Sequence, residues 1–177
     1  ETMDNSIDFI IRLIKEKGEN RIFLSIYGGE PLLNKSNLFK AIKKYKNLYA
    51  GVTIYWIINT NGTLLNEKDI RFLKRYDADL HISLDGPENI HNLTRIDKKG
   101  RPTFESVIRS LKMAKDFDMS RQINSYTTKK NVLYLKELVD IAHEYGVDRI
   151  YLDWFYTTKT PMEVYHTVHE YIKALKY

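Results

Sequence analysis

Apolar positions recur along the chain with two periods, that of a helix and that of a strand. Helical spacing predicts helices over 5–17, 35–49 and 66–76, and others that begin near 103, 131 and 160. Alternating apolar and polar positions predict strands over 22–27, 53–59, 80–84, 122–126 and 149–155. Five strands that alternate with helices imply parallel β–α–β units, either in part of a (β/α) barrel or in an open doubly wound sheet.

Capping residues mark the helix ends. The predicted N-caps are Asn5 or Ser6, Asn66, Thr103, Asn131 and Thr160, the last opening a capping box with Pro161 at the first helical position. Gly146 is predicted to end the helix that Asn131 begins. The predicted apolar face of that helix is Val132, Leu135, Leu138, Val139 and Ala142.

The strand over 80–84 has two unlike faces. Leu80, Ile82 and Leu84 share one face, whereas His81, Ser83 and Asp85 share the other. A parallel sheet covered by helices on both sides is apolar on both faces. The polar face therefore indicates the lumen of a barrel or a cleft, and Gln122, Asn124 and Tyr126 share a face in the same way.

Composition narrows the class of protein. With 177 residues, 43% of them hydrophobic, and no long apolar run, we expect a single domain over 1–177 without a membrane span. The net charge of +5 is spread over helix-like segments such as 40–46, which argues against a nucleic-acid partner. The absence of cysteine excludes disulfides and thiolate metal ligands within these residues and fits a cytoplasmic setting.

The stretch SIYGGEPLL, residues 25–33, places two glycines and a carboxylate directly after a predicted strand. Glycines let another molecule lie against the main chain. A tight strand-to-helix turn, with Glu30 as a solvated charge, would have the same composition. Two readings, a ligand edge and a plain turn, therefore stay open at this point.

Polar residues also follow the other predicted strands. Glu30 follows the first strand, Asn59 and Asn61 close the second, and Ser83 and Asp85 close the third. The carboxyl ends of parallel strands form the rim where such folds build their sites. Each residue taken singly is equally compatible with a turn or cap, but their joint placement favours a site.

Three motifs in order, YGGEPL, NTNG and ISLDGP, with the later His91, Arg95 and Thr103-Phe104, resemble the radical S-adenosylmethionine superfamily, in particular its sulfatase-maturating and peptide-modifying, SPASM-type branch. The resemblance covers residues from about 1 to 155. It implies a partial (β/α)₆ barrel of parallel strands that holds S-adenosylmethionine and a [4Fe-4S] cluster. It also implies reductive cleavage of the cofactor to a 5′-deoxyadenosyl radical, which abstracts hydrogen from a peptide or protein side chain, with flavodoxin or ferredoxin as electron donor.

The resemblance assigns roles to the rim residues. Gly28, Gly29 and Glu30 would receive the ammonium of the cofactor, since an ammonium needs carbonyl and carboxylate acceptors. Ser83 would lie near the cofactor carboxylate or ribose, and Asp85 would brace the turn before Pro87.

Other residues have less specific expectations. Asn59 and Asn61 would line the adjacent rim, and Arg95 would pair with the cofactor carboxylate as a fork-shaped donor. Asp153 could contact substrate or act as a base, with a structural hydrogen bond as an equal alternative. His81 is expected in the lumen rather than as a metal ligand.

One departure from the family pattern matters. The family holds its cluster with C-x-x-x-C-x-x-C after the first strand, and this chain has neither cysteine nor a counterpart of that strand. We therefore expect a fragment whose cluster ligands lie upstream of Glu1 and which is catalytically inactive alone. The alternatives are a degenerate barrel that binds a nucleoside or protein, and a phosphate-binding barrel, although the latter lacks a phosphate loop or a Schiff-base lysine.

Overall fold

The structure is a computed structural model that describes residues 2–46, 48–128 and 130–154. Its strands are β1 (Arg21–Ile26), β2 (Leu48–Tyr49), β3 (Val52–Thr60), β4 (Asp79–Ser83), β5 (Arg121–Thr127) and β6 (Arg149–Trp154). Its helices are α1 (Thr2–Glu16), η1 (Pro31–Asn34), α2 (Lys35–Tyr45), α3 (Glu67–Arg75), α4 (Glu88–His91), α5 (Phe104–Asp116), η2 (Val132–Tyr134) and α6 (Leu135–Glu144).

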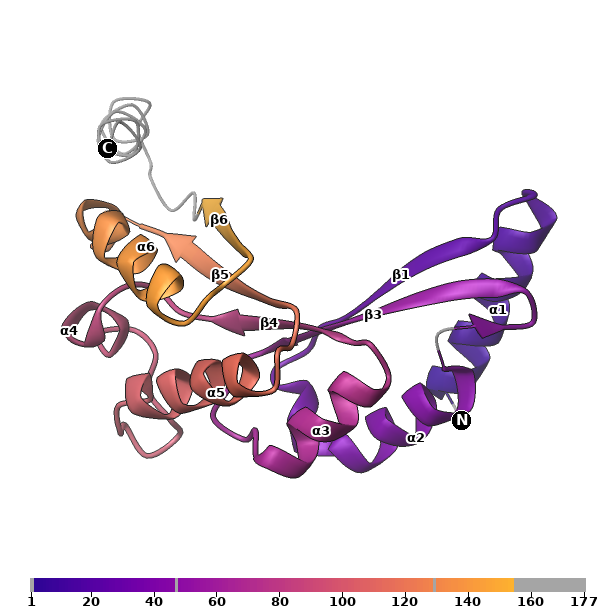
Figure 1. Cartoon of the computed structure of the whole chain (residues 1–177), viewed down its shortest axis with the longest axis horizontal. Coiled ribbons are helices and arrows are strands. Elements are labelled where there is room, and N and C mark those ends of the chain that lie inside the picture. The colour runs from indigo at the N-terminus through magenta and orange to yellow at the C-terminus, as the bar shows by residue number, and fades with distance from the viewer. Residues whose placement is uncertain (1, 47, 129, 155–177) are drawn as a thin grey trace.

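Five parallel strands form one curled sheet in the order β1-β3-β4-β5-β6, and β2 pairs antiparallel with the start of β3. The spatial order of the parallel strands follows their order in the chain. A doubly wound sheet reverses its order at a switch point, whereas a barrel continues around. The sheet is therefore a half-barrel (Figure 1), which confirms the predicted (β/α) barrel and removes the doubly wound alternative.

The outer, convex side of the sheet packs against the helices and forms the core (Figure 1). Apolar strand residues that face the helices are fully buried there, among them Trp56, Ile58 and Ile82. The concave side stays open, since Phe23 is 67% and Tyr151 57% exposed. The predicted difference between the two strand faces is thus the difference between core and lumen.

The first helix begins earlier than predicted. Asn5 and Ser6 lie inside α1 rather than at its N-terminus, and the Ser6 hydroxyl donates to the Thr2 carbonyl at 2.9 Å. The apolar stripe of Ile7 and Ile11 extends the helix toward the N-terminus past both polar residues. The cap prediction was therefore wrong, because Asn and Ser occur both at helix N-caps and on the exposed faces of helices, and the residue type alone does not distinguish the two.

The second helix ends earlier than predicted. α2 stops at Tyr45, and Lys46 takes a left-handed φ of 51°. The chain then forms β2, which the sequence pattern did not predict. By contrast, the predicted Asn66 cap of α3 is confirmed, with a complete capping box between Asn66 and Asp69.

Three further expectations on helices change. Val139, predicted in the core, is 51% exposed, because α6 begins at Leu135 after a 3₁₀ turn that shifts the buried stripe. The Thr103 hydroxyl does not cap α5, since the side chain of Asn92 accepts from the Thr103 and Phe104 amides. The helix predicted from Thr160 lies outside the described residues.

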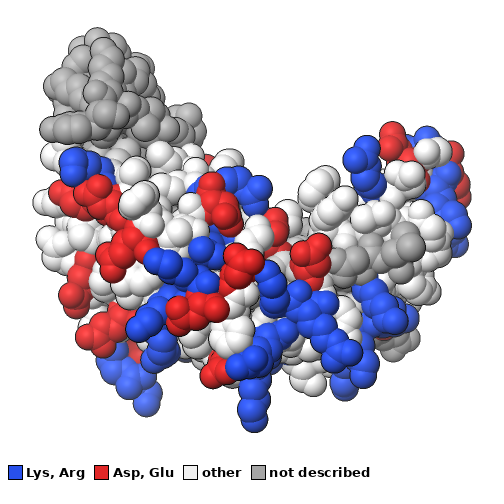
Figure 2. All heavy atoms as spheres, viewed as in Figure 1, with Lys and Arg blue, Asp and Glu red and all other residues white. Residues whose placement is uncertain are grey.

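Within the described part of the chain, no helix is both long and apolar enough to cross a membrane. Basic side chains on the face shown in Figure 2 are spread over the outer helices and interspersed with acidic ones. This distribution agrees with the solvated helix faces expected from the sequence.

Candidate functional site

Glu30 ties the end of β1 to the end of β3. Its Oε1 accepts hydrogen bonds from the Leu32 amide at 3.0 Å and the Thr60 hydroxyl at 2.7 Å. Its Oε2 accepts from the Asn61 amide at 2.8 Å. A carboxylate offers about four acceptor positions, so one remains after these three bonds. Glu30 therefore shapes the rim and can still accept from a ligand.

The two glycines before Glu30 present bare backbone. A Cβ atom built on Gly28 or Gly29 would meet no other atom within 4 Å. Among the described residues, neither glycine carbonyl accepts a hydrogen bond. The strand end therefore offers unused carbonyl oxygens and space for a bound molecule beside them, which favours the ligand edge over the plain turn.

A ladder of polar side chains crosses the concave face of four strands. Asn59 donates to the Ser25 hydroxyl at 2.9 Å and accepts from Asn124 at 3.0 Å. Gln122 Nε2 donates to Asn124 Oδ1 at 2.6 Å and lies 3.3 Å from His81 Nδ1. Burial lowers the pKa of His81, so the ladder ends on a neutral ring. The predicted rim residue Asn59 is thus committed to the protein's own network.

Asn61 has a local task as well. Its Oδ1 accepts from the Thr63 amide at 3.0 Å and the Thr63 hydroxyl at 2.8 Å. Such a turn fixes the backbone after β3. The Asn61 side chain lines the hollow, and its oxygen is already in use.

Asp85 is buried behind the rim and binds Arg95. The Asp85 carboxylate accepts from Arg95 Nε at 2.5 Å and Nη2 at 3.2 Å, and also from the Tyr126 amide at 2.9 Å. The predicted brace of the turn before Pro87 is therefore corrected: the carboxylate joins β4 to β5 and to the Arg95 loop. The main-chain carbonyl of Asp85 accepts a hydrogen bond from Asn131 Nδ2 at 3.0 Å.

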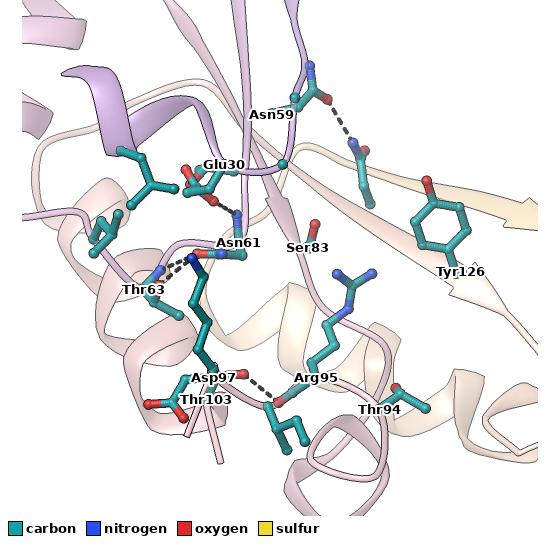
Figure 3. A pocket seen from close by; sticks show the side chains of 18 of the residues that line it. Glu30, Asn59, Asn61, Thr63, Ser83, Thr94, Arg95, Asp97, Thr103 and Tyr126 are labelled. Atoms are coloured by element: carbon teal, nitrogen blue, oxygen red, sulfur yellow. Dashed lines mark hydrogen bonds between the residues drawn. The ribbon is translucent and has the colours of Figure 1, made fainter. Parts of the chain in front are cut away.

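Arg95 keeps part of its fork free. Its guanidinium lies 5.7 Å from the ring centroid of Tyr126 and points toward Ser83 and Tyr126 (Figure 3). Within the described residues, Nη1 donates no hydrogen bond. The side chain is 23% exposed, so this nitrogen remains available for an anion.

His91 connects the turn at Asp85 with the loop that ends at Thr103. It is fully buried, its Nδ1 faces the Asp85 amide at 3.4 Å, and its Nε2 lies 3.1 Å from the Thr103 hydroxyl. The Thr103 hydroxyl donates to the Arg95 carbonyl at 2.7 Å, so Nε2 must carry the proton and donate to Thr103. Burial lowers the pKa of His91 to about 4, which keeps the ring neutral at ordinary pH.

The rim surrounds an open hollow of about 850 Å³. All the predicted site residues except Asp85 line it, namely Gly28, Gly29, Glu30, Asn59, Asn61, Ser83, Arg95 and Asp153. Figure 3 shows Glu30 and Asn61 on one side and the loop of Arg95 and Asp97 on the other. The strand ends thus bring together residues that lie more than a hundred positions apart in the chain.

Ser83 and Asp153 have side chains available to a ligand. In the part of the chain that the structure describes, neither side chain makes a hydrogen bond or ion pair. Asp153 is paired in register with Tyr126 and is exposed on the last described strand.

Sequence reasoning missed two parts of the site. Thr60, which binds Glu30, reads as an ordinary strand residue, although it lies within the NTNG motif. The loop from Thr94 to Arg101 also lines the hollow, and only its Arg95 was predicted, because nothing in the charged composition of the rest distinguishes it from a solvated turn.

A model of a protein family matches most of the chain. The model of the Radical SAM superfamily matches residues 2–130. An uncharacterised protein of Methanocaldococcus jannaschii is 33% identical over 153 residues, which cover 86% of this chain and 51% of that protein.

Two named relatives are similar over most of this chain. The radical SAM cyclopropyl synthase TigE of Paramaledivibacter caminithermalis is 29% identical, with 84% of this chain and 32% of that protein covered. The cysteine-type anaerobic sulfatase-maturating enzyme of Clostridium perfringens strain 13 is 27% identical, with 76% and 37% covered. The chain thus spans between about a third and a half of the length of these relatives.

Solved structures share the fold. Native anSMEcpe with bound AdoMet matches with a TM-score of 0.81 at 23% identity, over 97% of this chain and 49% of that chain. Streptococcus suis SuiB bound to its precursor peptide SuiA matches with a TM-score of 0.63 at 21% identity, over 97% and 40%. This chain therefore shares its fold with part of each of two larger proteins, one solved with bound AdoMet and one with a bound peptide.

Proposed function

We propose that this chain, which belongs to the radical SAM superfamily, is the S-adenosylmethionine-binding part of an enzyme that modifies a peptide or protein side chain. The observation that carries the proposal is the bare Gly28-Gly29 backbone beside Glu30 at the edge of the hollow. Relatives named as sulfatase-maturating enzymes and a cyclopropyl synthase support the substrate class. So do structural neighbours bound to AdoMet and peptides.

The rim supplies both ends of the amino-acid part of the cofactor with partners. The Gly28 and Gly29 carbonyls and the remaining Glu30 acceptor position receive the ammonium, as a charge-assisted set. The Ser83 hydroxyl and Arg95 Nη1 donate to the carboxylate. When bound, S-adenosylmethionine supplies the 5′-deoxyadenosyl radical on which the family's chemistry depends.

The iron-sulfur cluster has no ligands in this chain. Such clusters are held by cysteine thiolates, and the sequence contains none. The described residues also hold no group of His, Asp and Glu that could bind a metal ion. The proposal therefore places the cluster ligands and the contact with a flavodoxin or ferredoxin donor outside these 177 residues, and it predicts that the chain alone does not cleave S-adenosylmethionine.

Asp153 is the proposed substrate-side residue. It lines the hollow on β6, in register with Tyr126 of β5, is exposed, and has no partner in the described part of the chain. A carboxylate in this place can accept a proton from substrate or bind a peptide amide.

The test is a calorimetric titration of the chain with S-adenosylmethionine, with S-adenosylhomocysteine as competitor. Gly29→Val is the decisive variant: the backbone has room for the side chain, so we expect an unchanged melting temperature and a loss of binding. Ser120→Val adds a side chain of the same kind outside the hollow and should bind as the wild type does. Equal affinity of wild type and Gly29→Val would contradict the proposal, and so would preferred binding of a phosphosugar.

The absence of cysteine favours a second candidate, a half-barrel that binds a nucleoside or protein without catalysis. A nucleoside-binding half-barrel would also bind S-adenosylmethionine, so the titration alone does not separate it from the enzyme. The two candidates differ in the parent protein: after anaerobic reconstitution with iron and sulfide, S-adenosylmethionine and an added one-electron reductant yield methionine and 5′-deoxyadenosine only if the first candidate is correct.

A further inference from the structure

The loop over 96–102, called here the basic hairpin, has a defined shape. Ile96 and Pro102 form an antiparallel bridge, and the Asp97 amide donates to the Arg101 carbonyl at 2.9 Å. Asp97 Oδ1 accepts from the Lys99 and Arg101 amides at 2.8 and 2.9 Å. Hydrogen bonds from the Arg101 amide, the Arg101 side chain and the Lys99 amide lower the pKa of Asp97. The Asp97 carboxylate therefore stays charged and keeps these hydrogen bonds at neutral pH.

The basic hairpin is anchored to the body of the protein at its end. The Thr103 hydroxyl donates to the Arg95 carbonyl, and the Thr103 amide donates to Asn92 Oδ1 at 3.1 Å. In Figure 3, Asp97 lies across the hollow from Glu30 and Asn61. The hairpin is thus a fixed wall of the hollow rather than a loose loop.

Four cations line this side of the hollow, Arg95 just before the hairpin and three within it, and two of the four have carboxylate partners. Arg95 is paired with Asp85, and Arg101 is paired with Asp97 at 2.7 Å. Lys98 and Lys99 also line the hollow and are exposed, yet among the described residues neither forms an ion pair.

The acids of the hollow do not balance these lysines. Glu30 is held by three hydrogen bonds at the opposite rim, and Asp97 is occupied by the hairpin itself. Asp153 is the remaining acid of the lining and lies on β6. The hairpin side of the hollow therefore carries two uncompensated positive charges.

We propose that Lys98 and Lys99 receive an acidic residue, Asp or Glu, that flanks the reacting residue of a peptide substrate. This inference rests on the proposed function and names a feature of its substrate. The cofactor has one carboxylate, for which Arg95 and Ser83 already suffice, so the lysines address a second anion. Exposed Ile96 and Leu33, which also line the hollow, provide apolar contact for the neighbouring peptide residues.

The chemistry of the lysines fits a side-chain carboxylate. An ammonium on a flexible stem binds an anion as a point charge and does not demand the planar, two-point geometry that Arg prefers. Such exposed pairs contribute modestly and weaken with salt. The hairpin should therefore select among peptides rather than supply most of the affinity.

The experiment uses the 177-residue chain saturated with S-adenosylmethionine. Fluorescence anisotropy compares a short fluorescein-labelled peptide carrying a pair of glutamates with the same peptide carrying glutamines. We expect the glutamate peptide to bind about tenfold more tightly at low salt, a preference that added salt reduces. In Lys98→Gln/Lys99→Gln the two peptides should bind equally.

The matched control is Lys43→Gln/Lys112→Gln, which removes the same charge from exposed positions outside the hollow. It should keep the preference. Equal binding of both peptides by the wild type, or the same loss in the control, would overturn the inference. So would a parallel loss of S-adenosylmethionine affinity in Lys98→Gln/Lys99→Gln, since the lysines would then serve the cofactor. A wild type that does not bind S-adenosylmethionine at all would instead refute the proposed function.

Discussion

At the scale of single residues, the site depends on side chains that hold backbone rather than on side chains that only point into the hollow. Glu30 binds two amides and a hydroxyl from two different strand ends. His91 and Asp85 fix the Arg95 loop from the buried side. The ligand-facing groups are therefore positioned by residues whose own roles are structural, and their loss should reduce stability as well as binding.

Glu30→Gln tests this double role. The amide nitrogen of Gln cannot accept from Asn61 or from Leu32 and Thr60, so at least one donor loses its partner. We expect the free energy of unfolding to fall by about 2 kcal/mol, with weaker S-adenosylmethionine binding. Urea denaturation measures the free energy of unfolding. The control is Glu19→Gln, at an exposed carboxylate without a side-chain partner in the described residues. Equal loss in both variants would show that the Glu30 bonds do not matter.

His91 predicts a dependence of stability on pH. In the unfolded chain its pKa is 6.5, whereas burial holds it at about 4 in the fold. The unfolded state therefore takes up a proton first as the pH falls, and the free energy of unfolding should drop by roughly 3 kcal/mol between pH 6.5 and pH 4. The lowered pKa of His81 acts in the same direction.

Urea titrations across this pH range measure the effect. The slope should become smaller in His91→Gln and stay unchanged in His143→Gln, which alters an exposed histidine. If His91→Gln keeps the full slope, other groups carry the pH dependence.

At the scale of elements, short local signals decided some boundaries and tertiary contacts decided others. The Asn66 capping box lies entirely within four residues and formed as predicted. Asn5 and Thr103 are residue types that often cap helices. However, α1 begins before Asn5, and the side chain of Asn92, not that of Thr103, caps α5. Asn92 was not predictable, because its partners are eleven and twelve residues away.

Replacement of Asn66 and of Asn5 by alanine, one at a time, distinguishes a true N-cap from an apparent one. Asn66→Ala should lower the free energy of unfolding by about 1 kcal/mol through the loss of its bond to the Asp69 amide. Asn5→Ala should cause no loss, because Asn5 is an exposed position within a helix and alanine has the higher helix propensity. Chemical denaturation of both variants checks this, and a larger loss for Asn5→Ala would contradict the observed start of α1.

At the scale of the whole molecule, the half-barrel has two open sides. In the described sheet β1 and β6 form its edges, each paired with one strand only. Near the β1 edge, the rings of Phe23 and Tyr55 stack on the concave face with centroids 4.7 Å apart and remain exposed. Unpaired strand edges and exposed aromatic rings favour association with another chain.

We therefore expect the 177-residue chain to dimerise or aggregate through β1. Light scattering over a concentration series measures the mass, and hydrogen exchange tests whether the Arg21–Ile26 amides become protected as the mass rises. A monomer at every concentration would count against an available β1 edge. Association without protection of β1 would assign the contact to another surface.

The sequence by itself determined the strand and helix order, the two unlike strand faces and the rim residues, because these depend on periods of two and 3.6 residues and on motifs within single turns. Gly28, Gly29 and Ser83 could be placed at strand ends for that reason. Tertiary structure alone decided which polar groups are already used. Asp85, expected to brace a turn, binds Arg95, and Asn59 belongs to a hydrogen-bonded ladder across four strands. The basic hairpin lines one side of the hollow. These outcomes depend on distances between segments far apart in the chain, which curvature of the sheet sets and no local pattern encodes.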